Sequence, residues 1–182
     1  MTRLVHKPRQ KAFTIVELVI VVAVIAILAT ITIVAYNGVT ARSRDTAVKS
    51  GAQQFADALK LYSANTGKTP LQTGGGWGGN GSGWVSSGVN DPNYPVATET
   101  VLVNAGYLPS GFTASLPKNT KYNSNIYTLM LYGCTSTTYV VYYSLEAPSS
   151  DDVTAFNNVK SQCSNGATVQ TNYNMQGGVI IQ

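Results

Sequence analysis

The residue best placed to do chemistry is Glu17, because it is the only charged residue in an apolar stretch from Phe13 to Tyr36. A carboxylate in a membrane costs roughly 2.5–3.5 kcal/mol at the bilayer centre and less near the interface. Such a residue usually has a partner, and we expect this segment to supply none. The sequence therefore predicts that Glu17 pairs with a group on another chain, in an assembly that holds many such helices side by side.

The rest of the chain lacks a set of catalytic residues. Gly67-Lys68-Thr69 resembles the end of a phosphate-binding loop, but Tyr62 stands where that loop needs a glycine. Glycines at 74, 76 and 79 fit the dinucleotide-binding pattern, yet no strand leads into them. The single histidine, His6, lies ahead of the apolar stretch, so no imidazole follows to activate a nucleophile or bind a metal. We predict no enzyme, no cofactor and no metal site.

The excess positive charge lies at the start of the chain. Four of the twelve Lys and Arg residues stand in the first twelve positions, which contain no acid, and the other eight balance eight Asp and Glu. Basic residues ahead of a membrane span stay in the cytoplasm, so we expect everything after Tyr36 to lie outside. The balanced charge of the exported part predicts no nucleic-acid partner.

The element that carries Glu17 is an apolar run long enough to span a membrane. Leu18–Ala35 is interrupted only by two threonines, and its eighteen residues exceed the usual core of a secretory signal. A cleaved secretory signal is the alternative, but the small-x-small pattern that should follow the run fits poorly just ahead of Tyr36. We expect the run to be retained as a helix.

Beyond the span, the helical pattern continues with a single apolar face. Asp45 and Lys49 stand four residues apart in the order that favours an ion pair along a helix. Gly67 then ends a helix that we expect from about Phe13 to Asn65. The apolar face recurs every three or four residues, at Val48, Ala52, Phe55, Leu59 and Tyr62.

The C-terminal part is predicted to form loops, strands and a helix. Leu71–Gly88 contains eight glycines and is expected to be a loop. A one-sided helix begins near Ser150, with Val153, Phe156 and Val159 on its apolar side, and the stretch around Leu102–Pro109 fits either a short helix or a packed turn. The expected strands are Ile126–Gly133, Tyr139–Leu145 and Gly177–Ile181.

These elements predict an α+β fold. A long N-terminal helix, apolar in its first half and amphipathic in its second, packs against a C-terminal antiparallel sheet. We place the apolar helix at 13–36, its amphipathic continuation at 37–67 and the globular domain at 68–182.

The two cysteines, Cys134 and Cys163, both fall in the part expected outside the cell. In an oxidising compartment such a pair indicates one disulfide, which would stabilise the fold by roughly 3.6 kcal/mol in the chain-entropy model. Two unrelated buried thiols are the alternative.

The segment Lys11-Ala12-Phe13-Thr14-Ile15-Val16-Glu17-Leu18, followed by the long apolar run, resembles the processing signature of type IV prepilins and the related pseudopilins. The resemblance is strongest from Arg9 to Tyr36 and continues more loosely to Pro70. It implies a pilin-like fold and a cytoplasmic leader at 1–12, which a prepilin peptidase cuts between Ala12 and Phe13. The same enzyme would then methylate the new amino group of Phe13, and Glu17 would meet that amine on a neighbouring copy.

Two positions depart from the pattern of this family. Ala12 stands where most members have glycine, and Val34 stands where many have a helix-interrupting proline. Five consecutive β-branched residues at 30–34, followed by Asn37-Gly38, nevertheless lower helix propensity. We predict a weak zone around Thr30–Gly38 when the subunit packs in a filament.

The resemblance implies a structural subunit of a type IV pilus, anchored by a single pass in the cell membrane and later part of an extracellular filament. Its partners would be copies of itself, the prepilin peptidase and methyltransferase, the membrane and a pilus assembly platform. Adhesion, motility or DNA uptake are roles that such filaments serve.

Two alternatives are a pseudopilin of a type II secretion or competence apparatus, and a membrane-anchored glycan-binding module. In the second, Trp77 and Trp84, with Tyr139, Tyr142 and Tyr143, would stack on sugars, whereas tyrosines in the core and tryptophans that pin the loop are the simpler interpretation.

Overall fold

The computed structural model describes residues 13–89, 91–94, 96–124 and 126–182. The chain divides into two compact units that meet between Val39 and Thr40. The leader expected at 1–12 lies outside the described residues.

Helix α1 runs from Ile15 to Thr66 and ends at Gly67, whose left-handed φ of 72° is typical of the residue that follows a helix. Its first part is long and apolar enough to cross a membrane, and none of the side chains whose burial is described in that stretch is buried. The helix is continuous through residues 30–38, where the hydroxyls of Thr30 and Thr32 donate to carbonyls in the preceding turn. The weak zone concerns packing in a filament and stays a prediction.

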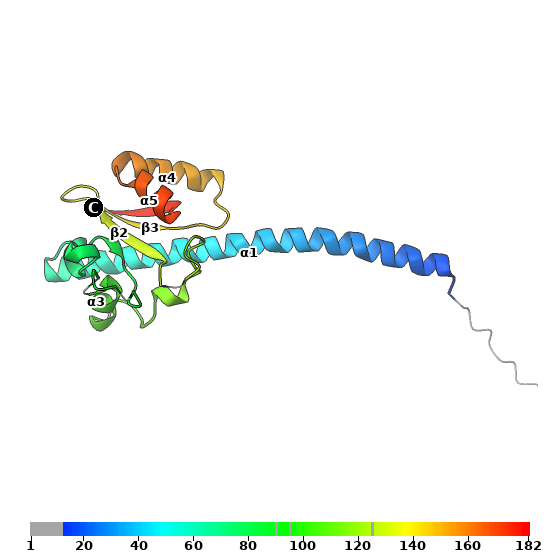
Figure 1. Ribbon diagram of the computed structural model, residues 1–182, viewed down its shortest axis with the longest axis horizontal. Coiled ribbons are helices and arrows are strands. Elements are labelled where there is room, and N and C mark those ends of the chain that lie inside the picture. Colours follow the sequence, from blue (N-terminus) through cyan, green and yellow to red (C-terminus); the bar gives the residue numbers. More distant parts are fainter. Residues whose placement is uncertain (1–12, 90, 95, 125) are drawn as a thin grey trace, which may run out of the picture. The chain divides into compact units, whose positions relative to one another are not determined.

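The second part of α1 forms the base of the globular unit. The side chains predicted for its apolar face are all buried, namely Val48, Ala52, Phe55, Leu59 and Tyr62. All of them except Val48 belong to one core with residues of strands β2 (Leu129–Gly133) and β3 (Tyr139–Tyr143), which lie beside this part of α1 in Figure 1. The expected helical periodicity is therefore confirmed.

The sheet contains four antiparallel strands in the order β1-β2-β3-β4, comprising Gly83–Trp84, Leu129–Gly133, Tyr139–Tyr143 and Gly177–Ile181. Because strand side chains alternate between faces, Leu129, Leu131 and Val141 pack in the core with α1, while Val140 and Tyr142 pack in a second core on the opposite face.

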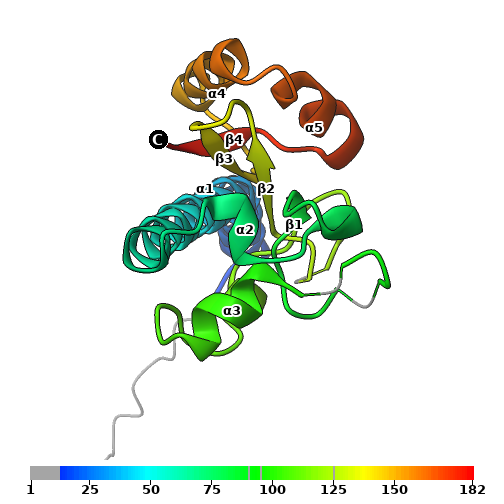
Figure 2. The ribbon, with the colours of Figure 1, turned by 90° about the vertical axis from the view of Figure 1, so that its left-hand side faces the viewer.

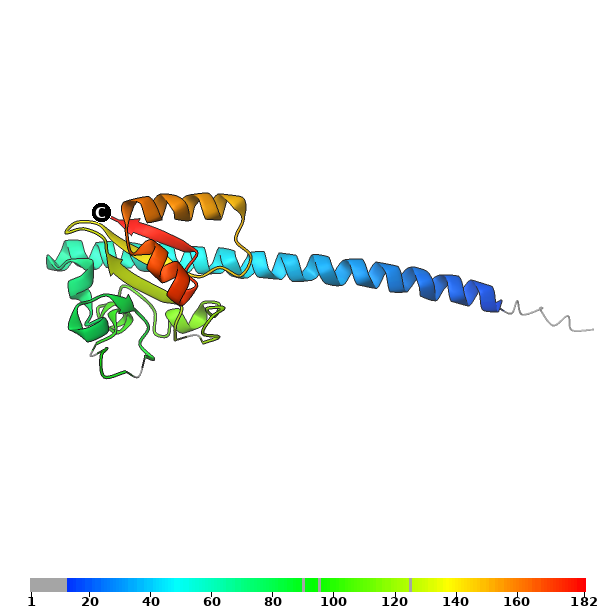
Figure 3. The ribbon, with the colours of Figure 1, turned by 45° about the horizontal axis from the view of Figure 1, so that its top comes forward.

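The shorter helices complete the globular unit. Helices α4 (Ser150–Gln162) and α5 (Gly166–Tyr173) contribute to the second core, and Figures 2 and 3 show α4 across the sheet from α1. Helices α2 (Pro70–Thr73) and α3 (Thr98–Asn104) follow α1 in the chain, with short 3-10 turns at Trp77–Gly79 and Thr113–Ser115. The α+β class, with a long helix on an antiparallel sheet, is confirmed.

Several local predictions were wrong. The segment Leu71–Gly88 is not a plain loop, because most of α2, a 3-10 turn and strand β1 lie in it. Helix α5 was not predicted. Val153, expected on the apolar side of α4, is exposed. The buried face of that helix consists of Phe156 and Val159.

Two buried carboxylates tie loops to helices through backbone donors. Asp45 on α1 is only 4% exposed and accepts hydrogen bonds from the backbone nitrogens of Glu146 and Ala147, at 2.7 and 2.9 Å. Glu99 on α3 is buried and accepts from the backbone of Ser87 and from both the backbone and the hydroxyl of Thr113. These bonds hold the backbone at Glu146 and Ala147 against α1, and the backbone at Ser87 and Thr113 against α3.

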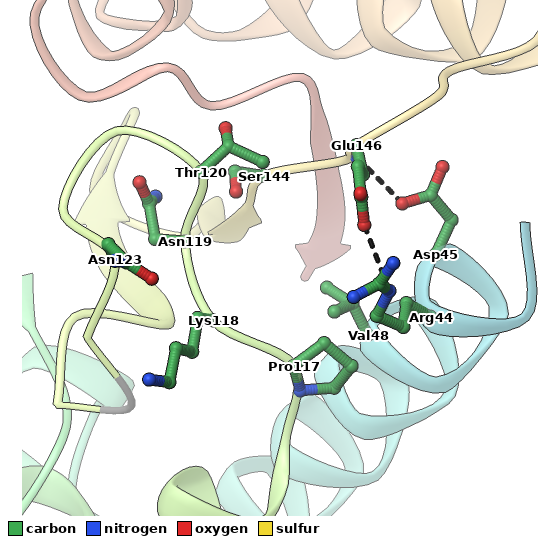
Figure 4. Close-up of a pocket in the computed structure, with 10 residues that line it drawn as sticks. All are labelled: Arg44, Asp45, Val48, Pro117, Lys118, Asn119, Thr120, Asn123, Ser144 and Glu146. Atoms are coloured by element: carbon green, nitrogen blue, oxygen red, sulfur yellow. Dashed lines mark hydrogen bonds and ion pairs between the residues drawn. The ribbon is translucent and has the colours of Figure 1, made fainter. Parts of the chain in front are cut away.

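The expected ion pair between Asp45 and Lys49 is absent among the described contacts, because each side chain has a partner elsewhere. Lys49 forms an ion pair with Asp152, in the first turn of α4. Arg44 pairs with Glu146 at 3.0 Å, as Figure 4 shows beside Asp45. One stretch of α1 thus holds the connection from β3 to α4.

Replacing Asp45 tests this connection. Asp45→Asn keeps one oxygen that can accept from one backbone nitrogen, but it turns an amide donor toward the other and removes the charge. Hydrogen bonds to a charged group contribute about 1.5–3 kcal/mol each. We expect the free energy of unfolding of the full chain, measured by urea titration in a neutral detergent, to fall by at least about 1.5 kcal/mol. Asp57→Asn, an exposed acid on the same helix, is the control. Equal effects of the two substitutions would contradict the role given to Asp45.

Because of the ion pair between Lys49 and Asp152, we expect the stability of the folded chain to depend on pH. Burial of Asp152 by itself raises the pKa of its carboxyl, but hydrogen bonds from Lys49 and from the backbone and hydroxyl of Ser149 together hold that pKa below its usual range. A carboxyl with a lowered folded pKa adds stability that is present above its unfolded pKa of about 3.9 and is lost as the pH falls through the folded value. Asp152→Asn should therefore flatten the loss of stability in this acid range, as measured by thermal unfolding against pH. Asp151→Asn, an exposed neighbour, should leave the profile unchanged.

Candidate functional site

The start of α1 is organised around Glu17 and Thr14. The backbone nitrogen and the hydroxyl of Thr14 donate to Oε2 of Glu17 at 2.9 and 2.8 Å, and the Glu17 nitrogen donates back to the Thr14 hydroxyl at 3.2 Å. This reciprocal arrangement is a capping box, which satisfies backbone donors that a helix start leaves free. The local sequence Thr-x-x-Glu is its usual signature.

The expectation that this segment supplies no partner for Glu17 was wrong for hydrogen bonds, since Thr14 is one. The described part of the chain nevertheless gives Glu17 no cationic partner, because its two ion pairs involve Glu146 and Asp152. Both bonds from Thr14 use Oε2, and Oε1 accepts none from the described residues. One carboxylate oxygen is therefore available to a donor from elsewhere.

The surroundings of Glu17 are apolar and uncovered. Phe13 and Ile15 are each 82% exposed, and the large apolar side chains that follow along α1 are also exposed. Ala12, on the other side of the predicted cut, lies outside the described residues. The site combines one acid with a broad apolar helix surface, an arrangement suited to binding rather than to catalysis.

The two tryptophans do not form the flat platform that the glycan-binding alternative would require. Trp77 is 50% exposed, but Trp84 is only 7% exposed, in contact with the rings of Tyr122, Tyr127 and Tyr173. Both indoles line a cavity of about 380 Å³.

The strand tyrosines named with the tryptophans are placed elsewhere. Tyr139 and Tyr142 are buried, and Tyr143 packs against the core beside α1. The aromatic side chains that join the tryptophans in the cavity were not singled out in the sequence. Only Tyr132 could have been placed from the sequence pattern. It follows Leu131 in β2, and neighbouring residues of a strand point to opposite faces of the sheet. The missed residues are Tyr94, Tyr122, Tyr127, Tyr132 and Tyr173.

A second cavity, of about 370 Å³, lies beside α1 and is drawn in Figure 4. Its charged lining includes Arg44, Asp45 and Glu146, which are bound to one another as described above. These groups serve the connection between α1 and α4, so we do not treat this cavity as a site.

A disulfide joins Cys134, just after β2, to Cys163 at the end of α4. Neither cysteine is free for redox or metal chemistry. Within the described ranges, no group of three His, Cys, Asp or Glu side chains could hold a metal ion.

Comparison with known proteins finds a family motif that covers the start of α1. Residues 7–33 match the model of the prokaryotic N-terminal methylation motif. The chain is 34% identical over 111 residues to the type IV major fimbrial protein FimA of Dichelobacter nodosus, a match that covers 61% of this chain and 65% of that protein. The chain thus spans slightly less than two thirds of this relative. No solved structure gives a significant match.

The capping box makes a prediction for the helix start. Thr14→Val keeps the shape of the side chain but removes the hydroxyl, and loss of such a cap costs about 1 kcal/mol. The backbone amides of Glu17 and Leu18, which donate to Thr14, should then exchange hydrogen roughly fivefold faster, as measured by mass spectrometry on the full chain in neutral detergent. Thr14→Ser retains the hydroxyl and should exchange like the wild type. Unchanged exchange in Thr14→Val would show that the cap does not hold this turn.

Proposed function

We propose that this chain, a type IV pilin by its N-terminal methylation motif and its fimbrial relative, is a structural subunit of an extracellular pilus. Residues 13–36 would anchor it in the membrane before assembly and form the filament core afterwards. The observation that carries the proposal is the exposed apolar half of α1 with Glu17 as its only charge.

The apolar surface alone does not explain assembly. Lipid chains cover apolar side chains as well as a neighbouring helix does, so moving from lipid to protein brings little hydrophobic gain. A specific polar contact is needed to favour the filament. Glu17 is the only charged group in this segment that can provide one.

Processing would create the matching group. A prepilin peptidase would cut between Ala12 and Phe13 on the cytoplasmic side and methylate the new amine of Phe13. That cation would pair with Glu17 of a neighbouring copy through Oε1, while Thr14 keeps Oε2. Opposite charges about 4 Å apart gain roughly 4 kcal/mol at an effective dielectric of 20.

The pseudopilin role is the second candidate, since the processing signature is shared by both groups. The name of the relative, a major fimbrial protein, favours the pilus. The pilus assembly platform and the prepilin peptidase are the further partners that the proposal requires.

Mass spectrometry of the chain purified from sheared filaments tests the processing step. We expect a mature chain that begins at Phe13 and carries one added methyl group. A chain that keeps residues 1–12, or begins at another residue, would refute this step.

Substitution of Glu17 tests assembly separately. Glu17→Ala should leave cleavage intact but reduce the yield of filaments by more than tenfold, because breaking a buried ion pair costs about 3–5 kcal/mol. Glu17→Gln can still accept from Thr14, so its failure to assemble would identify the charge as the required feature. Asp57→Asn, on the exposed side of the same helix, is the control. A wild-type filament yield from Glu17→Gln would contradict the ion pair.

A further inference from the structure

The aromatic cavity of the globular unit has no part in the proposed assembly. It holds about 380 Å³ and is lined by seven aromatic side chains drawn from the segments around 77–94, 122–132 and 173. These segments lie around β1 and the start of β2, shown in Figure 2. Trp84 is its most buried member, while Trp77 and Tyr122 are the most exposed.

Several of the rings meet at steep angles around the cavity, whereas Tyr122 and Tyr173 stack at 26°. Trp77 contacts Tyr94 with ring centres 5.6 Å apart at 68°, and Trp84 contacts Tyr127 at 5.0 Å and 64°. Sugar stacking needs a flat, open ring face, which Trp84 does not provide. Rings set at angles around a space instead offer the ring surfaces that bind organic cations.

The charge of the cavity favours a cation. Among the described residues that line it there is no Lys, Arg or His, and Asp91 is the single acid. Oδ1 of Asp91 accepts from the backbone and side-chain nitrogens of Asn93, both at 2.8 Å, and Oδ2 accepts no hydrogen bond from the described residues. A ligand with phosphate, sulfate or carboxylate inside the cavity would meet only negative charge.

The ionisable groups in and near the cavity are consistent with a site for a cation. Burial raises the pKa of Tyr132 to about 12 and also raises the pKa of Tyr94, so these phenols stay neutral at physiological pH. Lys121, the nearby cation, places Nζ 5.9 Å from the ring centre of Tyr122 and donates to the carbonyl of Asn172. It is not part of the lining.

We propose that this cavity binds a methylated ammonium group, with the aromatic rings around the cation and the Asp91 carboxylate balancing its charge. Aromatic cages of this composition recognise choline and methylated lysine. The proposal goes beyond filament formation and does not rest on it.

The test uses the full chain in a neutral detergent that contains no ammonium headgroup. Both tryptophans of the chain line the cavity, so intrinsic tryptophan fluorescence reports on this site. The probe is choline chloride, and its neutral carbon isostere, 3,3-dimethylbutanol, is the matched control. We expect choline to bind at least tenfold more tightly than the isostere. Equal binding would show a merely apolar cavity, and an absence of choline binding would also overturn the proposal.

Three variants separate the parts of the site. Asp91→Asn keeps an oxygen for Asn93 but removes the charge, and Trp77→Leu removes an exposed ring, so each should weaken choline binding by about tenfold. Asp151→Asn removes an exposed charge outside the cavity and should bind choline like the wild type. If Asp91→Asn binds choline as tightly as Asp151→Asn, the carboxylate has no role and the proposal fails.

The source of the ammonium group is distinguished by two further probes. Glycerophosphocholine represents a lipid headgroup, and trimethyl-lysine represents a modified protein. Tighter binding of one than of free choline identifies the source. Binding of neutral oligosaccharides in place of all three ammonium compounds would assign the cavity to glycans and overturn the proposal. Filaments can form whatever the result, so failure here is distinct from failure of the proposed function.

Discussion

The constraint on which this molecule depends is that a single helix carries two surfaces with different requirements. The second part of α1 has its apolar face covered by the sheet, whereas the first part exposes apolar side chains all round. Water cannot serve as the neighbour of the first part, because each large side chain left exposed forgoes about 1.5–3 kcal/mol of burial energy. In the proposed function a membrane or other copies of the helix cover it, and its few polar groups decide between the two.

The globular unit uses acids in a different way. Asp45 and Glu99 are buried, yet their partners are backbone nitrogens and a hydroxyl rather than cationic side chains. Buried carboxylates are tolerated only where hydrogen bonds replace water. Each acid thus fixes a segment distant in the sequence, the connection after β3 for Asp45 and the segments at Ser87 and Thr113 for Glu99, and each needs a defined backbone geometry to do so. Glu17 differs because its hydrogen bonds occupy only one of its two oxygens.

The periodic elements were predictable because periodicity reports burial directly. The apolar face from Val48 to Tyr62 and strand β4 agree with the sequence pattern. The ion pair predicted between Asp45 and Lys49 was wrong, because spacing along a helix carries no information about distant segments. The backbone that binds Asp45 begins at Glu146, 101 residues later in the chain. The aromatic cavity was missed for the same reason. Its members come from segments without a common period, and only the fold brings Tyr94, Tyr132 and Tyr173 together.

The link between Cys134 and Cys163 has a mechanical consequence. Strand β3 is central in the sheet, and both β3 and α4 lie within the segment that this bond closes. A pulling force applied between α1 and the C-terminus would pass through β1 and β2 to Cys134 and then directly to Cys163. The covalent load would bypass β3 and α4, so that extension is limited to the segments before Cys134 and to the tail formed by α5 and β4.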